Sequence, residues 1–372
     1  MGHIRDVEAI PVEVGVRSLD DGGIAPYVSN HDVVHTRQRM LVRVETDEGV
    51  VGWGEFLVTM ESPTSTKAIV NEVIAPELVG RHTTDLRSFV EEFYFPYVNV
   101  DPFVGGMEMA LWDIHGKELG ASVADLLGGP VREEIPIAYC LGILNTEEAA
   151  TYARRAKERG FSVLKTKAGQ DWHEDVERIA AMYDAVDGDM EFRLDPNQGW
   201  SPEETVRVAS TLEEMGIYLQ YLEQPERVDT YGSYRELRSR TRTPIAVNED
   251  TYSRYNLHHL LKADAIDVAV VDIVPGGGIL RTRELAGLAG QAGVSVAHHS
   301  GFDLGIKTAA MLQTIATTPA INLAPDSVYY AWEEYMLESP LAVEDGAITL
   351  PAGPGLGVSV DEAAVERHRI RC

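Results

Sequence analysis

Residues 161–195 read FSVLKTKAGQDWHEDVERIAAMYDAVDGDMEFRLD, and this stretch contains the unit from which the fold can be predicted. It begins and ends with short apolar runs, and an acidic, amphipathic segment lies between them. Such runs are typical of strands and such a segment of a helix. The runs lead to Lys167 and Asp195, which are separated by about the 25–30 residues that a strand, a helix and two loops occupy. The stretch therefore predicts one βα unit.

The same unit recurs along the second half of the chain. Short apolar runs lead to polar residues every 23–28 positions, namely Lys167, Asp195, Glu223, Glu249 or its neighbour Asn248, Asp272 and His299. A further run, AINLAPD at residues 320–326, supplies an eighth strand. This alternation predicts a (β/α)-barrel, which would bring the polar side chains together at its C-terminal mouth, where barrel enzymes place their chemistry.

The rest of the chain divides into a region before the barrel and a region after it. Residues 4–57 alternate apolar and polar side chains, which predicts strands, and residues 64–127 have helical periodicity. Gly128-Gly129-Pro130 is typical of a boundary. We predict an α+β domain at 1–128, a barrel domain at 129–350 and a C-terminal segment at 351–372 that returns to the first domain.

The 372 residues have a net charge of −27, from 59 acidic and 32 basic side chains. This field argues against nucleic acid or an anionic membrane as a partner. Only seven of the basic residues are lysines, and the acidic residues are dispersed along predicted helices. We interpret this as a halophilic surface, because high salt screens the self-repulsion. An ordinary acidic enzyme is the alternative.

The chain shows no membrane or secretion signal. No apolar run is long enough to span a membrane, and the first residues lack the basic-then-apolar layout of a signal peptide. Cys140 lies in a predicted strand and Cys372 is the last residue, which is neither a disulfide framework nor a zinc pattern. We expect a cytoplasmic protein that acts on a small molecule, and we expect a homo-oligomer.

Two lysines stand at the end of the same predicted strand. Lys165 and Lys167 are two residues apart, so both side chains would point into the barrel mouth. Neighbouring ammonium groups and partial burial lower the pKa of a lysine, which would make one of the pair a base near neutrality. The alternative is a solvated strand edge.

Oxygen ligands follow on the next three strands. Asp195 with Asn197, then Glu223, then Asn248 and Glu249 offer carboxylate and amide oxygens without thiols. Such a set suits Mg²⁺. The alternative is that these side chains bind loop amides or arginines.

Asp272 and His299 end two further neighbouring strands. A carboxylate beside an imidazole fixes its tautomer and raises its basicity, which makes a general acid or base. His298 must face the other way. The alternative is that the histidine is a satisfied core residue.

Taken in order, Lys-x-Lys, Asp-x-Asn, Glu-x-Pro, Asn/Glu, Asp and His resemble the enolase superfamily in its mandelate racemase-like and glucarate dehydratase-like branches. The GWGE at 52–55 and the PGLGV at 354–358 belong to the same likeness. It implies an α+β capping domain over a modified (β/α)₇β barrel. It also implies a Mg²⁺-dependent abstraction of the proton α to a carboxylate, and supports an inward-facing His299.

The resemblance also indicates a branch. The lactonising and epimerase branches carry a lysine after the sixth strand, where this chain has Asp272. PIAVNED resembles the dehydratase strand whose third metal ligand is an asparagine, here Asn248, although Glu249 competes for that role. By the same likeness Asn197, Tyr139 and His31 would contact substrate. The family's eighth-strand glutamate has no secure match, since Asp326 is only nearby.

We therefore expect a Mg²⁺-dependent acid-sugar dehydratase that gives a 2-keto-3-deoxy acid. Lys165 would neutralise charge on the substrate carboxylate, Lys167 or His299 would take the α-proton, and His299 would protonate the departing β-hydroxyl. The loops at 18–36 and 55–62 would close over the site. A racemase or epimerase of an α-hydroxy acid is the enzymatic alternative, and a catalytically silent binding protein is the third.

Overall fold

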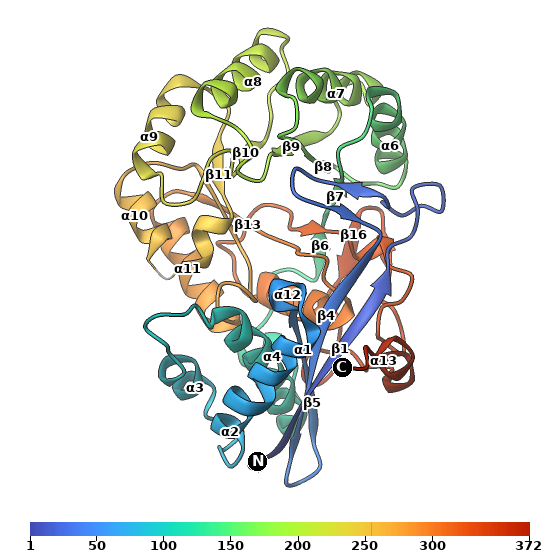
Figure 1. Cartoon of the computed structure of the whole chain (residues 1–372), viewed down its shortest axis with the longest axis vertical. Coiled ribbons are helices and arrows are strands. Elements are labelled where there is room, and N and C mark those ends of the chain that lie inside the picture. Colours follow the sequence, from blue (N-terminus) through green and yellow to red (C-terminus); the bar gives the residue numbers. More distant parts are fainter. Residues whose placement is uncertain (254) are drawn as a thin grey trace.

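The computed structural model describes residues 1–253 and 255–372. Its centre is an eight-stranded, nearly closed parallel barrel surrounded by helices, and an α+β capping domain lies against it (Figure 1). The predicted architecture, a modified (β/α) barrel with an N-terminal capping domain, is confirmed. Among the helices of the described residues, none is long and apolar enough to cross a membrane.

The barrel strands follow one another in chain order around the sheet. They are β7 (Ala138–Leu141), β8 (Val163–Lys167), β9 (Glu191–Asp195), β10 (Tyr221–Glu223), β11 (Ile245–Val247), β12 (Val268–Val271), β13 (Ser295–His298) and β14 (Asp326–Ser327). Each polar residue selected from the sequence as ending an apolar run is the last residue of one of these strands or follows it by one or two positions. All of them therefore lie at the same end of the barrel, as the spacing predicts.

The eighth strand is shorter than the sequence suggests. The sequence predicts an eighth strand within 320–326, and β14 comprises only Asp326–Ser327, which pair with Ala138–Tyr139 of β7. On the other side a single bridge joins Ile321 to Val296 of β13. The closing segment thus pairs with β13 at Ile321 and with β7 at Asp326 and Ser327, and Asp326 is the first residue of β14.

Seven helices follow the first seven barrel strands and cover the outside of the barrel. They are α6 (Thr146–Glu158), α7 (Trp172–Ala185), α8 (Pro202–Glu214), α9 (Tyr231–Arg240), α10 (Asn256–Lys262), α11 (Ile279–Gln291) and α12 (Gly305–Ala316). Local sequence fixes where several of them begin. Ser201 and Glu204 form a capping box at the start of α8, and Asn145 and Asp171 cap α6 and α7.

The capping domain is an antiparallel sheet with helices packed on it. Its strands are β1 (Ile4–Gly15), β4 (Thr36–Thr46) and β5 (Val51–Leu57), and a small hairpin, β2 (Tyr27–Val28) with β3 (Val33–Val34), lies in the loop between β1 and β4. The helices are α1 (Pro63–Ile69), α2 (Ala75–Leu78), α3 (Leu86–Glu92), α4 (Asp101–Leu119) and α5 (Val123–Leu126). The predicted loop at 18–36 therefore contains an ordered hairpin.

Two glycines of β5 allow α4 to pack closely on the capping sheet. A Cβ on Gly54 would lie 2.0 Å from the carbonyl oxygen of Gly106, and one on Gly52 would lie 2.3 Å from that of Ala110. A side chain at either position would push the helix away. Glu55, the next residue, is fully buried and reaches the first turn of barrel helix α12.

The end of the chain contacts the first domain. A three-stranded sheet of β6 (Glu134–Pro136), β15 (Val343–Glu344) and β16 (Ala347–Thr349) precedes the last helix, α13 (Glu362–His368). Beyond α13, Ile370 donates a backbone hydrogen bond of 2.8 Å to Pro11 in β1. The last residues are therefore joined to the edge of the capping sheet.

Candidate active site

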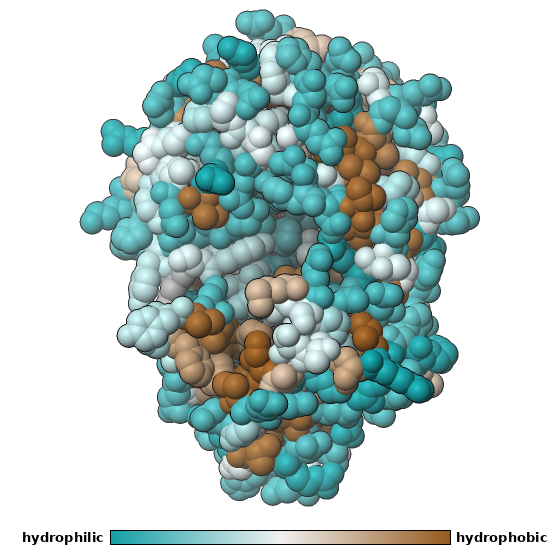
Figure 2. Space-filling model, viewed as in Figure 1, coloured by the Kyte–Doolittle hydropathy of each residue, from teal (hydrophilic) through white to brown (hydrophobic). Residues whose placement is uncertain are grey.

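A cavity of about 770 Å³ lies between the barrel mouth and the capping domain. The space-filling view is hollowed at this place (Figure 2). Residues between 27 and 38 and between 57 and 61 line it from the capping domain, so both predicted covering loops contribute. Barrel residues line the rest of it, among them Cys140, Lys165, Lys167, Asn197, His299 and Asp326.

Lys165 lies at the centre of a cluster of carboxylates. Its Nζ is 2.7 Å from Glu223 Oε1, 2.7 Å from an oxygen of Asp326 and 3.1 Å from Asp195 Oδ2. Burial lowers the pKa of Lys165, but the three carboxylates outweigh burial and raise it well above its ordinary value. The expectation that the neighbouring lysine would lower this pKa is therefore wrong. Lys165 is a fixed positive charge.

Lys167 faces the same cavity from the end of β8. Its Nζ is 2.5 Å from Asp195 Oδ2 and 2.6 Å from Asn197 Oδ1. The side chain is about one-eighth exposed, whereas that of Lys165 is almost fully buried. Of the two lysines, Lys167 is thus the one placed to meet a ligand in the cavity.

The proposed metal ligands differ in whether their side-chain oxygens already have hydrogen-bond partners. Oε2 of Glu223 and Oε2 of Glu249 are buried, and neither has a hydrogen-bond partner among the described residues. Asn248, by contrast, donates to Val270 O and accepts a hydrogen bond from Tyr252. Orphaned carboxylate oxygens favour Glu249 over Asn248 as the third ligand.

The carboxylates do not form a preassembled coordination site for a metal ion. Within residues 1–253 and 255–372, no group of three or more His, Cys, Asp or Glu side chains is arranged to hold an ion. Asp195 and Glu223 are bonded to lysines instead. Burial nevertheless raises the pKa of Glu223 to about 7, against the charge of Lys165. A hard cation suits this donor set, because it would satisfy the orphaned oxygens.

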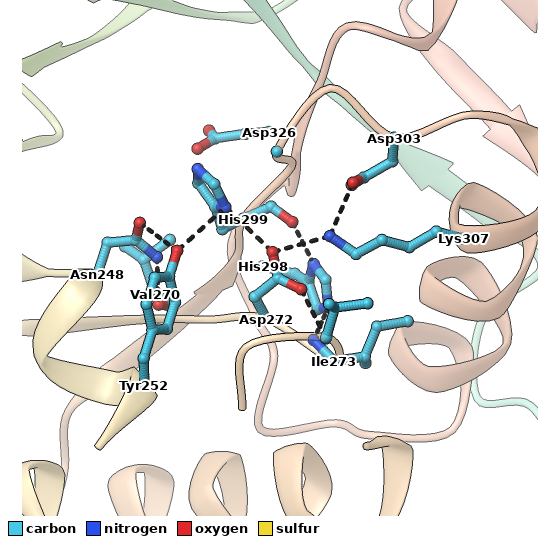
Figure 3. A network of polar contacts seen from close by, with 12 residues as sticks. Asn248, Tyr252, Val270, Asp272, Ile273, His298, His299, Asp303, Lys307 and Asp326 are labelled. Atoms are coloured by element: carbon cyan, nitrogen blue, oxygen red, sulfur yellow. Dashed lines mark hydrogen bonds and ion pairs between the residues drawn. The ribbon is translucent and has the colours of Figure 1, made fainter. Parts of the chain in front are cut away.

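Asp272 and His299 form a dyad on the other side of the cavity (Figure 3). His299 Nδ1 is 3.1 Å from Asp272 Oδ2 and 3.3 Å from the hydroxyl of Tyr252. The other carboxylate oxygen of Asp272 accepts the backbone N–H of Val274 at 2.9 Å. With Nδ1 directed at the carboxylate, Nε2 of the imidazole is left for the cavity.

His298 faces away from the cavity, as the alternation along a strand predicts. Its side chain is fully buried, Nε2 accepts the backbone N–H of Ile273, and Nδ1 is 2.7 Å from the carbonyl oxygen of His299. Burial lowers the pKa of His298 to about 4. It is therefore a neutral core histidine, and His299 is the member of the pair that reaches the cavity.

The structure corrects the expectation that Tyr139 contacts substrate. In β7, Tyr139 is in register with Leu164, whereas its neighbour Cys140 is in register with Lys165 and lines the cavity. Side chains alternate along a strand, so Tyr139 points out of the barrel. There its ring stacks on Tyr330 with centroids 4.6 Å apart.

His31 lies at the rim of the site. Its Nε2 is 2.8 Å from the carbonyl oxygen of Asn197. It is exposed, and it is absent from the described residues that line the cavity. His31 therefore joins the capping loop to the barrel loop, while its neighbours Ser29 and Asp32 line the cavity.

Two buried residues at the site, Asp326 and Lys307, were not among the site residues predicted from the sequence. Asp326 accepts hydrogen bonds from Lys165 and Arg193, and Lys307 donates to Asp272 at 2.9 Å. Asp326 begins the two-residue strand β14, after the apolar run at 320–325. Lys307 lies on helix α12 and not at a strand end. Its rarity as one of seven lysines was the only available signal.

Family descriptions match both parts of the chain. Residues 13–128 match "Mandelate racemase / muconate lactonizing enzyme, N-terminal domain", and residues 148–364 match "Enolase C-terminal domain-like". Together they cover the capping domain and most of the barrel.

Individual relatives match over nearly their whole length. D-galactarolactone cycloisomerase of Agrobacterium fabrum is 30% identical over 90% of this chain and 92% of its own. N-succinyl-L-Arg/Lys racemase of Bacillus cereus is 27% identical, covering 92% and 93%. Among solved structures, an isomerase from Streptomyces coelicolor has a TM-score of 0.84 at 32% identity, over 99% and 97% of the two chains.

Proposed function

The chain belongs to the mandelate racemase and muconate lactonizing enzyme family of the enolase superfamily, and on that premise we propose that it is an acid-sugar dehydratase. It would remove the proton α to a carboxylate and expel the hydroxyl at the β-carbon. The observation that carries this proposal is the pairing of two proton-transfer groups, Lys167 and His299, on one cavity beside the fixed charge of Lys165.

Charge stabilisation is the first requirement of this chemistry. Removing an α-proton places negative charge on the substrate carboxylate as an ene-diolate forms, and a positive group near those oxygens stabilises it. Lys165 supplies such a charge from the floor of the cavity. Asp195, Glu223 and Glu249, or Asn248 in place of Glu249, would hold Mg²⁺. The bound ion would supply Lewis-acid stabilisation of the same oxygens.

Proton transfer is the second requirement. The α C–H bond breaks as its proton passes to Nζ of Lys167 or to Nε2 of His299. The β C–O bond then breaks as imidazolium at His299 gives its proton to the leaving oxygen, so that water departs. Asp272 stabilises that imidazolium and fixes its orientation. The enol product takes a proton at the former β-carbon and becomes a 2-keto-3-deoxy acid.

The lining of the cavity supports an acid sugar as substrate. The capping domain contributes Ser29, Asp32, His35, Arg37 and Gln38, which offer donors and acceptors for several hydroxyl groups. One relative is named for its action on a sugar lactone, D-galactarolactone. If the expelled β-oxygen belongs to a lactone ring, its loss opens the ring without releasing water, and the product is an isomer of the substrate.

A racemase or epimerase of an α-hydroxy acid is the second candidate. Lys167 and His299 come from strands β8 and β13, which two other strands separate along the shorter way around the barrel. Two bases that reach one carbon from different directions can remove a proton from one face and return it to the other. A relative at 27% identity is named as a racemase.

Product analysis separates these reactions. The protein with Mg²⁺ in molar KCl is incubated in D₂O with a panel of aldonates, aldarates and their lactones, and products are identified by NMR and mass spectrometry. A dehydratase gives a 2-keto acid with loss of one water. A lactone cycloisomerase gives a keto acid of unchanged formula. A racemase gives only α-deuteration with inversion. Absence of both deuterium uptake and keto acid across the panel would contradict the proposal.

A further inference from the structure

Lys307 shares a carboxylate oxygen with the catalytic imidazole. Its Nζ is 2.9 Å from Asp272 Oδ2, and the same oxygen is 3.1 Å from His299 Nδ1 (Figure 3). The two nitrogens are therefore at most about 6 Å apart. Lys307 is 2% exposed, and nothing in the proton transfers described above requires it.

A chain of buried charges connects Lys307 to the capping domain. Lys307 Nζ also donates to Asp303 at 2.8 Å, and Asp303 lies 3.2 Å from Arg39 of β4. Arg39 donates in turn to Glu55 of β5 at 2.9 Å. Each member of this chain is at most 2% exposed. Ion pairs therefore run without interruption from the capping sheet to the dyad.

The capping domain also fixes the backbone that carries Lys307. Glu55 accepts the backbone N–H groups of Leu304 and Lys307 at 2.8 and 2.9 Å, at the start of helix α12. A carboxylate at this position satisfies free N–H groups and opposes the helix dipole. The first turn of α12, and with it Lys307, is thus held from the capping domain.

Such a chain is costly to bury. Removing charges from water costs several kcal/mol per ion, and apolar residues of equal volume often stabilise a fold as well. A buried lysine beside a proton-transfer dyad is therefore poorly explained by stability alone. Burial lowers the pKa of Lys307, but Asp272 and Asp303 outweigh it and raise that pKa, so the ammonium stays charged.

We infer that Lys307 is a positioning residue of the dyad, which holds Asp272 against His299 Nδ1 and places a fixed positive charge behind the imidazole. The inference rests on the proposed role of His299 in proton transfer.

The charge matters because His299 is in direct contact with a carboxylate. Asp272 contacts it, and the charges of Glu223 and Asp326 act on it across the barrel mouth. Tyr252, whose hydroxyl is 3.3 Å away, and the neutral His298 also lie beside it, and Lys165 contacts both Glu223 and Asp326. Lys307 contacts the same carboxylate oxygen as the imidazole, so its positive charge offsets part of the negative charge of Asp272.

The test compares Lys307→Met, which removes the charge, with Lys307→Arg, which keeps it. Lys117→Met is the control, because Lys117 forms an ion pair of similar length, 2.6 Å, with the buried Asp113 in the capping domain, away from the cavity. With the substrate that the panel identifies, we expect Lys307→Met to lower kcat at least tenfold with KM changed less than threefold. Lys307→Arg should recover much of the loss, and Lys117→Met should keep full turnover.

A second readout does not depend on turnover. In protein labelled with ¹⁵N-histidine, the imidazole of His299 is assigned by its loss in His299→Asn, and its titration is followed by NMR. We expect its midpoint to move to higher pH by about one unit in Lys307→Met and to stay near the wild-type value in Lys307→Arg and Lys117→Met. If Lys307→Met does not fold, the double variant Lys307→Met/Asp303→Asn replaces it in both measurements. The double variant removes both charges of the Lys307–Asp303 ion pair.

The outcomes separate the inference from the proposed function. An unchanged His299 titration in Lys307→Met, or an unchanged kcat with an unchanged pH profile, would overturn the inference. A shifted titration in a protein that turns over no acid sugar would support the positioning role and contradict the proposed function.

Discussion

The two sides of the barrel mouth satisfy their carboxylates in different ways. On the lysine side, defined as Lys165, Lys167, Asp195, Glu223 and Asp326, the ammonium group of Lys165 contacts three carboxylates, and Glu223 Oε2 has no partner among the described residues. On the histidine side, defined as Asp272, His299 and Lys307, both oxygens of Asp272 are bonded.

This difference indicates two tasks. A site that leaves a buried carboxylate oxygen unsatisfied is incomplete without a further positive group, so the lysine side fits a cation and the substrate carboxylate that the cation would hold. A site whose carboxylate is fully bonded already holds its imidazole in one orientation, so the histidine side is pre-organised for proton transfer. The predictions that follow test this division.

Removing Mg²⁺ should have the largest effect. If the lysine side depends on the ion, chelation should lower turnover by about 10³-fold or more, since a metal supplies several kcal/mol of charge stabilisation. Activity is measured after chelation and again after Mg²⁺ is restored at constant ionic strength. Full activity after exhaustive chelation would place the charge stabilisation on the lysines alone.

The third ligand distinguishes two neighbouring residues. Glu249 has an orphaned oxygen and Asn248 has its amide engaged, so Glu249→Ala should weaken Mg²⁺ binding about tenfold or more, and Asn248→Ala only a few-fold. Calorimetric titration of each variant with Mg²⁺ measures this. A larger loss in Asn248→Ala would reverse the assignment, and small, equal losses would mean that the ion binds elsewhere.

A buried glutamate at the domain junction should give a pH-dependent stability. Glu108 of α4 accepts the backbone N–H groups of Ile279 and Leu280 at the start of α11, and burial raises its pKa to about 7 against those two hydrogen bonds. The folded protein therefore binds a proton more tightly than the unfolded chain does. This contribution is fully present below about pH 4.5 and is lost as the pH rises through about 7.

The measurement is unfolding free energy against pH for wild type and Glu108→Gln. Between pH 5 and 7 the wild-type stability should fall, relative to the variant, by up to about 1.4 kcal/mol per pH unit. Parallel curves would show that Glu108 ionises alike in the folded and unfolded chains.

Salt should act on the whole surface and not on either side of the mouth. The protein has a net charge of −27, and its acidic side chains repel one another. This repulsion extends over a Debye length of about 30 Å at 0.01 M salt but only about 3 Å at 1 M. With Mg²⁺ held constant, the melting temperature should rise by at least a few degrees from dilute buffer to molar KCl. A flat or falling melting temperature would contradict a halophilic surface.

The barrel and most site positions could be predicted from the sequence because they follow from strand geometry. A polar residue at the end of an apolar run lies at the mouth whatever the loops do, so Asp195, Glu223 and His299 could be placed from spacing. Tyr139 was instead expected at the site from the family resemblance alone. Its neighbour Cys140 faces the cavity, because a shift of one residue along a strand reverses the face.

The residues that escaped prediction are those whose position depends on tertiary contacts. Asp326 closes the predicted run at 320–326, but its contacts with Lys165 and Arg193 depend on how the barrel closes. Lys307 lies on a helix, and it reaches Asp272 only because Glu55 and Arg39 of another domain fix the start of that helix. No local pattern connects residues 39, 55 and 307.

The central claim, that Lys167 and His299 move the protons of one reaction, is tested most directly by deuterium exchange in two variants. Lys167→Ala and His299→Asn are each incubated in D₂O with the identified substrate and Mg²⁺, and both elimination and α-deuteration are measured by NMR. Elimination should fall by about 10²–10⁴-fold in each variant, because general acid–base groups contribute that much. Exchange at the α-carbon should survive in one variant, which identifies the remaining residue as the base. Near-normal elimination in both variants would contradict the claim.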